Sequence, residues 1–132
     1  MCLTHPEPEE PLLETNPTRM CELLVGLPDV NVIGVGDWPE YLRVAITTRA
    51  ERPSCPGCGG RVHRHDVDEV ELADLPCFGR RTRLVWHKLR CRCPNPACRV
   101  VTFTETDARI ADRAAAITDR AGRWATIQVG SH

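Results

Sequence analysis

Cys55-Pro56-Gly57-Cys58 and Cys93-Pro94-Asn95-Pro96-Ala97-Cys98 are the two stretches that decide the fold of this chain. Each holds two thiols a few residues apart, which is the ligand spacing of a tetrahedral zinc site. Small residues in and after the first stretch let the backbone double back, so that both sulfurs face one point. The sequence therefore predicts one zinc ion bound by Cys55, Cys58, Cys93 and Cys98.

The two cysteine pairs enclose residues 59–92, and this layout is typical of a zinc ribbon. Four thiolates fill the tetrahedron and leave no position for water, so the predicted ion is structural and takes no part in catalysis. The competing interpretations are unrelated buried thiols and a redox pair at Cys55 and Cys58. A redox pair of this spacing opens a helix after a strand, whereas Gly59-Gly60 follows here, which favours zinc.

Other cysteines and histidines are weaker candidates for the metal. Cys91 shares a strand face with Cys93, but its loop to Cys98 is too long for a tight turn, so Cys93 is the better ligand. The histidines at positions 63, 65 and 87 could supply nitrogen ligands, although four thiolates already complete the shell. Cys2, Cys21 and Cys77 have no partner at ligand spacing and are expected to be ordinary thiols, with Cys77 packing beside Phe78.

Length and composition bound the class of protein. The chain has 132 residues, of which 5% are aromatic, so it has room for one compact domain with little bulky material for a core. A metal would supply part of the missing stability. The first residues resemble no signal peptide and no segment is long and apolar enough to span a membrane. We therefore expect the eight cysteines to be reduced in a cytoplasmic protein without membrane contact.

The chain divides into four segments, and together they predict a small α+β fold. Residues 1–17 are acidic and rich in proline, which predicts a flexible tail. Residues 18–54 contain a short predicted helix, 20–25, and two alternating runs, 30–35 and 42–48, that indicate a pair of strands. Residues 55–105 form the predicted zinc ribbon of antiparallel strands. Residues 106–132 favour a helix in which Ile117, Ala121, Trp124 and Ile127 or Gln128 fall near one face.

Charge is distributed unevenly along the chain, although the formal net charge is only −1. Four acids and no base occupy residues 1–16, and five acids lie between Asp66 and Asp74. Residues 75–104 hold no acid and seven bases, namely Arg80, Arg81, Arg83, Lys88, Arg90, Arg92 and Arg99. Such a local concentration of positive charge suits contact with phosphates.

The stretch from Arg80 to Cys93 alternates as a strand does. Odd positions from Val85 onward are largely apolar and lead into the metal site, while the even positions are mostly basic and include Trp86. The basic face could lie along a nucleic acid, with the arginines on phosphates and Trp86 against a sugar or base. The candidate contact residues are Arg80, Arg81, Arg83, Trp86, Lys88, Arg90 and Arg92. The alternative is a solvated strand face whose charges only prevent edge pairing, and the acidic run 66–74 could also pair with it and mask it.

A resemblance to a known family rests on several motifs in residues 55–105. They are Cys55-Pro-Gly-Cys58-Gly, Leu72-Ala-Asp74-Leu75-Pro76, Gly79-Arg80, Leu84-Val85-Trp86, Arg90-x-Arg92-Cys93-x-Asn95-Pro96-x-Cys98 and Thr102-Phe103-x-Glu105. Together they resemble the zinc-finger head of bacterial ISL3-type insertion-sequence transposases. An aromatic residue usually stands in that family where this chain has Cys91, which agrees with Cys93 as the ligand.

The resemblance implies that the four matched cysteines bind zinc and that the head helps to recognise the terminal inverted repeats of the element. Members of the family continue into a helix-turn-helix and a catalytic domain of ribonuclease-H type. We therefore expect a truncated, catalytically inert transposase head that binds DNA. The alternative is a protein-interaction module that pairs with the full-length transposase through residues 18–49 and the C-terminal helix.

Overall fold

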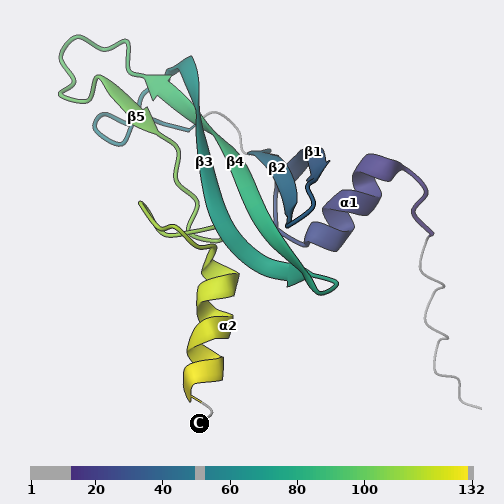
Figure 1. The fold of residues 1–132 in the computed structure, drawn as a ribbon. Helices are drawn as coiled ribbons and strands as arrows, with labels where there is room; N and C mark the ends of the chain where they lie inside the picture. Colours follow the sequence, from purple (N-terminus) through teal and green to yellow (C-terminus); the bar gives the residue numbers. More distant parts are fainter. Residues whose placement is uncertain (1–12, 50–52, 131–132) are drawn as a thin grey trace, which may run out of the picture.

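The computed structural model describes residues 13–49 and 53–130, and it has a small α+β fold as predicted. Two helices flank one mixed sheet (Figure 1). Most of the predicted acidic tail, residues 1–12, lies outside the described part, as does Cys2. In chain order the elements are α1 (Pro17–Val25), β1 (Val30–Asp37), β2 (Leu42–Thr48), β3 (His63–Cys77), β4 (Arg80–Arg92), β5 (Thr102–Thr104) and α2 (Asp119–Gly130).

Local signals at both ends set the bounds of α1. The side chain of Asn16 accepts a hydrogen bond from the amide of Arg19 at 3.0 Å, and Pro17 occupies the first turn. Gly26 ends the helix with a φ of 68°, and its amide bonds to the carbonyl of Glu22. These short-range contacts explain why the sequence predicted this helix to within a few residues.

The order of strands in the sheet is β1-β2-β4-β3, and β5 pairs with β4. The predicted strand pair before the ribbon is the antiparallel pair β1 and β2. β2 then lies parallel to β4, with Leu42 beside Thr82 and Ile46 beside Trp86. The ribbon and the segment before it therefore share one sheet, and β3 with β4 forms its long curved hairpin (Figure 1).

The main hydrophobic core lies on the face of the sheet that carries the even positions of β4. Register places Trp86 beside Ile46 and Val70, and all nine members of the core are less than one-tenth exposed. Ile110 and Ala111, from the loop after β5, pack against this face of the sheet. The core consists of Val30, Val32, Val44, Ile46, Leu72, Leu84, Trp86, Ile110 and Ala111.

The prediction that Trp86 stands on an exposed basic face is wrong, because its exposed fraction is 0%. Leu84 has the same value, so the even positions from Thr82 to Trp86 face the core, whereas Arg80 at the start of β4 and Arg90 and Arg92 at its end reach solvent. Lys88 lies between the two halves, with its Nζ 4.4 Å from the centre of the Trp86 ring. Alternation identified the residues that share a face, but it could not show that residues 110–111 would cover part of that face.

The predicted C-terminal helix is shorter than its segment, since α2 begins at Asp119 after an irregular stretch. Ala121 is buried, whereas Trp124 and Ile127 are 52% and 66% exposed. The apolar side of α2 is therefore covered near Ala121, at the start of the helix, and exposed at Trp124 and Ile127. Neither helix of the described residues is long and apolar enough to cross a membrane.

Candidate metal centre and basic surface

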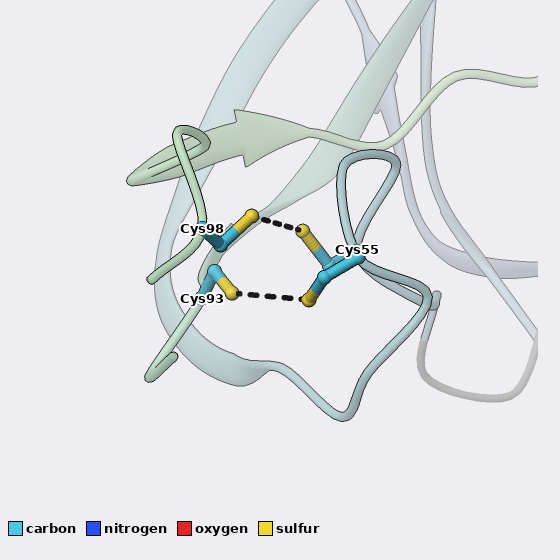
Figure 2. Close-up of side chains that lie close together, drawn as sticks. Cys55, Cys93 and Cys98 are labelled. Atoms are coloured by element: carbon cyan, nitrogen blue, oxygen red, sulfur yellow. Dashed lines mark hydrogen bonds between the residues drawn. The ribbon is translucent and has the colours of Figure 1, made fainter. Parts of the chain in front are cut away.

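Four cysteine sulfurs converge at one end of the long hairpin, as the sequence predicted (Figure 2). Cys55, Cys58, Cys93 and Cys98 each offer a sulfur, and all four atoms lie within 4.8 Å of one another. The sulfurs of Cys55 and Cys98 are 3.7 Å apart, as are those of Cys58 and Cys93. A tetrahedron of zinc–sulfur bonds of about 2.3 Å has edges of about 3.8 Å. The donor set and its size therefore fit zinc.

Backbone hydrogen bonds close the first metal loop. The carbonyl of Cys55 accepts from the amide of Gly59 at 2.8 Å, and the amide of Cys55 donates to the carbonyl of Gly60 at 3.1 Å. Gly59 has a φ of 70°, a conformation that glycine adopts without strain. Gly57 is required for a different reason, because a Cβ there would lie 2.9 Å from the Cys98 sulfur and 2.8 Å from a methyl of Val100.

The second metal loop is held by its own amides. The amide of Cys98 donates to the carbonyl of Asn95, and that of Ala97 donates to the Asn95 side chain at 3.0 Å. The amide of Cys93 pairs with the carbonyl of Val101 at 2.9 Å, which continues the β4–β5 pairing into the loop. Both sulfurs of this loop are therefore placed by an ordered backbone.

The protein environment stabilises the thiolate form of Cys55 but destabilises that of Cys93. Hydrogen bonds from the amides of Cys58 and Gly57 lower the pKa of Cys55 to about 7, although burial opposes them. The amide of Asn95 favours the Cys93 thiolate, but burial and the neighbouring sulfurs together raise the pKa of Cys93 to about 12. Zinc ligation by all four thiolates would therefore release protons near neutral pH.

A small apolar cluster surrounds the cysteines, apart from the main core. Val62 and Cys91 are buried there with Cys55 and Cys93, and Phe103 packs against them. Cys91 and the histidines at positions 63, 65 and 87 are not members of the metal cluster among the described residues. This cluster excludes water from the inner side of the metal site.

Residues 51–98 match a family model described as the zinc-finger of transposase IS204/IS1001/IS1096/IS1165. These residues are similar to the zinc ribbon of the ISL3-family transposases. The matched model describes the ribbon alone, and no catalytic domain was detected in the chain. Comparisons with curated proteins and with solved structures found no match.

The predicted basic residues of the ribbon fall into two groups. Toward the hairpin turn, Arg80 pairs with Asp37 at 2.8 Å, and Arg83 lies over the Tyr41 ring and 3.8 Å from Glu71. Arg90 and Arg92 toward the zinc end, and Arg81 beside the turn, are exposed and form no ion pair with any residue in 13–49 or 53–130. The positive charge that remains unneutralised is thus largest toward the zinc end of the ribbon.

The acidic run 66–74 does pair with the basic strand, since it forms much of β3. Asp66 lies beside Arg90 and Asp68 beside Lys88 in the register, while Glu69 and Glu71 form ion pairs with Arg43 of β2. The masking anticipated from the sequence therefore affects mainly the middle of the hairpin.

The zinc end of the ribbon holds a further basic residue, Arg64, that was not predicted from the sequence to contact DNA. The start of β3 places His63 beside Arg92 and Arg64 beside Cys91, and all but Cys91 are exposed. His63, Arg64 and Arg92 line a surface hollow of about 620 Å³ together with His65 and the second metal loop. Antiparallel pairing of β3 with β4 brings them together, but the register shifts between Asp74 and Cys77 and between Arg64 and Asp66 mean that a simple count from the turn would not give this pairing.

Proposed function

We propose that the chain is the zinc-structured, DNA-binding part of an ISL3-type transposase and that it contacts the terminal inverted repeats of the element. The match of residues 51–98 to a transposase zinc finger supports this proposal. The four thiolates leave no coordination position for water, so the metal would shape the surface and perform no chemistry. Binding without cleavage is the function that this part of the chain supports best.

The exposed guanidinium groups of Arg90 and Arg92 are the observation that carries the proposal. Both follow the buried half of β4, and neither has an ionic partner within the described residues. Arg64 and the second metal loop lie beside them across the hairpin. Arginines held at fixed spacing on a strand suit contact with phosphates, which position a protein on DNA.

Lys88 and Arg83 have smaller roles in this proposal than the sequence suggested. Lys88 is half-buried over the Trp86 ring, and Arg83 is shared between Tyr41 and Glu71. The proposed contact with DNA phosphates therefore centres on Arg64, Arg90 and Arg92, with Arg81 near the hairpin turn.

Replacing Arg90 and Arg92 by Ala tests the proposal. We expect weaker binding to inverted-repeat duplexes at low salt and a salt-dependence slope smaller by about 2, because each lost phosphate contact lowers the slope by about 1. Zinc content should be unchanged. The matched control replaces Arg19 and Arg123, which lie on the helices and whose own side chains are 48% and 71% exposed. Equal binding by the two double variants would refute the proposal.

A second candidate function is pairing with a full-length transposase. It is favoured by the exposed apolar side chains of α2, Trp124 and Ile127, and of α1, Leu23 and Leu24. Sedimentation of the chain alone and mixed with such a transposase would detect the pairing. Replacement of Trp124 and Ile127 by Gln should abolish it while leaving DNA binding intact.

The truncated transposase proposed from the sequence is tested separately, by the genomic DNA beyond the codon for His132. A reading frame there that encodes a helix-turn-helix and catalytic acids would support an interrupted element. A frame without them would favour a free-standing adaptor.

A further inference from the structure

The turn between β3 and β4 contains a residue that its backbone does not favour. Phe78 and Gly79 connect the strands, with φ values of 49° and 82°. Two positive φ values are typical of a type I′ turn, in which the first position strongly prefers Asn, Asp or Gly. A bulky side chain at positive φ is an outlier. Folding of the hairpin therefore does not explain why a phenylalanine stands here.

Packing does not explain Phe78 either. Its side chain is 86% exposed, and it belongs to neither apolar cluster of the described residues. Cys77 was predicted to pack beside Phe78, but whatever contact it makes leaves the Phe78 ring almost wholly in solvent. The turn lies at the end of the hairpin away from the metal loops (Figure 1). A large apolar ring is thus presented at an extremity of the molecule.

The turn that holds Phe78 is followed by two arginines, one of which joins it to the turn between β1 and β2. Arg80 donates hydrogen bonds to Asp37 and to the carbonyl of Trp38, at 2.8 and 3.0 Å, and so ties the β1–β2 turn to this hairpin. The Trp38 ring is about half exposed and stacks on Tyr41. Arg81 is exposed next to the turn. The segment that joins β1 to β2 holds two carboxylates, Asp37, whose charge is neutralised by the ion pair with Arg80, and Glu40.

We propose that Phe78 is a wedge that enters the minor groove of duplex DNA and partly unstacks one base step. Proteins that kink DNA insert an apolar side chain in this way while adjacent arginines hold the backbone. Arg81 is placed to contact the phosphates beside the insertion. The inference rests on the proposed DNA-binding function and adds a second contact, distinct from the arginines at the zinc end.

The length of the hairpin is compatible with both contacts on one duplex. From Arg80 to Arg92 an extended strand covers at most about 40 Å at 3.3 Å per residue, which is close to one turn of DNA. Duplex DNA is favoured over an apolar pocket in a protein because the exposed Arg81 stands beside the ring and forms no ion pair with any residue in 13–49 or 53–130, and residues 75–104 contain no acid. A protein pocket for the ring remains an outcome that the experiment distinguishes.

Bending of a short mixed-sequence duplex tests the wedge. With fluorescent dyes at the two ends, the wild-type chain should shorten the distance between them, because a wedge kinks the duplex by about 20–90°. Phe78→Asn should retain zinc and melt no lower than wild type, because Asn suits the turn. It should still bind with a salt dependence, but several-fold more weakly and without the shortening. Leu24→Gln is the control, since it removes another exposed apolar residue, and it should bend DNA as wild type does.

The other outcomes overturn the inference in distinguishable ways. Wild-type binding without bending, or equal bending by Phe78→Asn, removes the wedge and leaves the DNA-binding proposal standing. Absence of wild-type binding at any salt concentration removes both. If Phe78→Asn changes only the sedimentation of the chain, the ring contacts protein and the wedge is wrong.

Discussion

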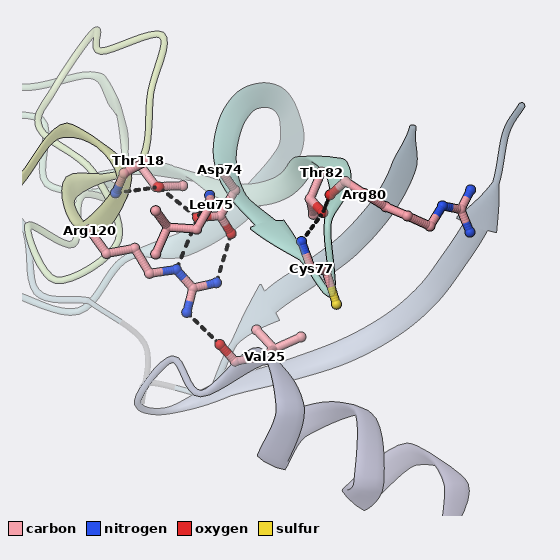
Figure 3. A network of polar contacts seen from close by, with 9 residues as sticks. Val25, Asp74, Leu75, Cys77, Arg80, Thr82, Thr118 and Arg120 are labelled. Carbon is pink, nitrogen blue, oxygen red and sulfur yellow. Dashed lines mark hydrogen bonds and ion pairs between the residues drawn. The ribbon is translucent and has the colours of Figure 1, made fainter. Parts of the chain in front are cut away.

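Asp74 of β3 and Arg120 of α2 form a bidentate ion pair that joins the ribbon to the C-terminal helix (Figure 3). Arg120 donates from Nε and from its guanidinium end to the two carboxylate oxygens of Asp74, at 2.9 and 2.7 Å. Thr118 donates to the same carboxylate at 2.8 Å, and Arg120 also donates to the carbonyl of Val25 at the end of α1. One buried carboxylate thus organises three segments that are remote in sequence.

Replacement of Asp74 by Asn should lower the free energy of unfolding by about 3 kcal/mol at neutral pH, since it leaves Arg120 without its counter-charge. Asp37→Asn, which loses only an exposed pair with Arg80, should cost less than about 1 kcal/mol. Urea denaturation monitored by circular dichroism measures both changes. A cost for Asp74→Asn no larger than that of the control would show that the buried pair is unimportant.

The same variant should reveal a pH dependence. Burial alone would raise the pKa of Asp74, but hydrogen bonds from Arg120 and Thr118 outweigh it and hold that pKa below its ordinary value of 3.8. A lowered pKa in the folded state stabilises the protein above the unfolded pKa, and this stability disappears as the pH falls through the folded value. The difference between wild type and Asp74→Asn should therefore be constant from pH 5 to 7 and should shrink below about pH 4. A difference that grows toward acid would contradict this assignment.

Gly57→Ala should weaken zinc binding about 10- to 100-fold, because the added methyl would meet the Cys98 sulfur and Val100. Gly122→Ala in α2 is the matched control, since nothing lies within 4 Å of a Cβ there. Competition with a chromogenic chelator measures both affinities. Equal affinities would mean that the loop can shift without loss of the metal site.

Glu105 bridges the gap on the edge of β4 between β2 and β5. Its carboxylate accepts from the amide of Leu89 at 2.8 Å and from the hydroxyl of Thr48 at 2.7 Å. Glu105→Ala should cost about 2 kcal/mol of unfolding free energy because it leaves the Leu89 amide without an acceptor. Glu71→Ala, which removes an exposed acid, should cost less than about 1 kcal/mol. Similar costs for the two variants would argue against a bridging role.

Removal of zinc by a chelator should disorder the metal end while the main core persists. None of the four cysteines belongs to the core around Trp86. Hydrogen exchange should therefore accelerate at the amides of Cys55, Gly59 and Cys93 and remain slow in the β1–β2 pairing. Protection retained at the metal loops would contradict a structural zinc. Loss of protection throughout would show that the two clusters unfold as one unit.

The features that could be predicted from the sequence depend on local signals. The metal loops are set by cysteine spacing and glycine, and α1 is set by Asn16 and Gly26. The two strands of the β1–β2 pair follow from alternation and a turn. The signal for each feature is local, in the spacing within each cysteine pair, the caps of α1 and the alternation within each strand, even where the contact itself joins distant residues such as Cys55 and Cys98.

The exposure of β4 could not be predicted in the same way. Its two faces were identified by alternation, yet Trp86 was placed in solvent because the cover from Ile110 and Ala111 comes from a distant loop. The parallel alignment of β2 with β4 was also missed. Which face of a strand is buried depends on what packs against it, and period-two alternation does not contain that information.

The sequence by itself determined the four-cysteine zinc site, the strand from Arg80 to Cys93 that leads into it and the concentration of positive charge in residues 75–104. Only the tertiary structure decided which of those charges reach solvent, placing Arg64 beside Arg92 and pairing Arg80 with Asp37. It also left the Phe78 ring exposed at the end of the hairpin. The physical reason is that ligand spacing acts over a few residues, whereas burial and ion pairing depend on strand register and on segments brought together from across the chain.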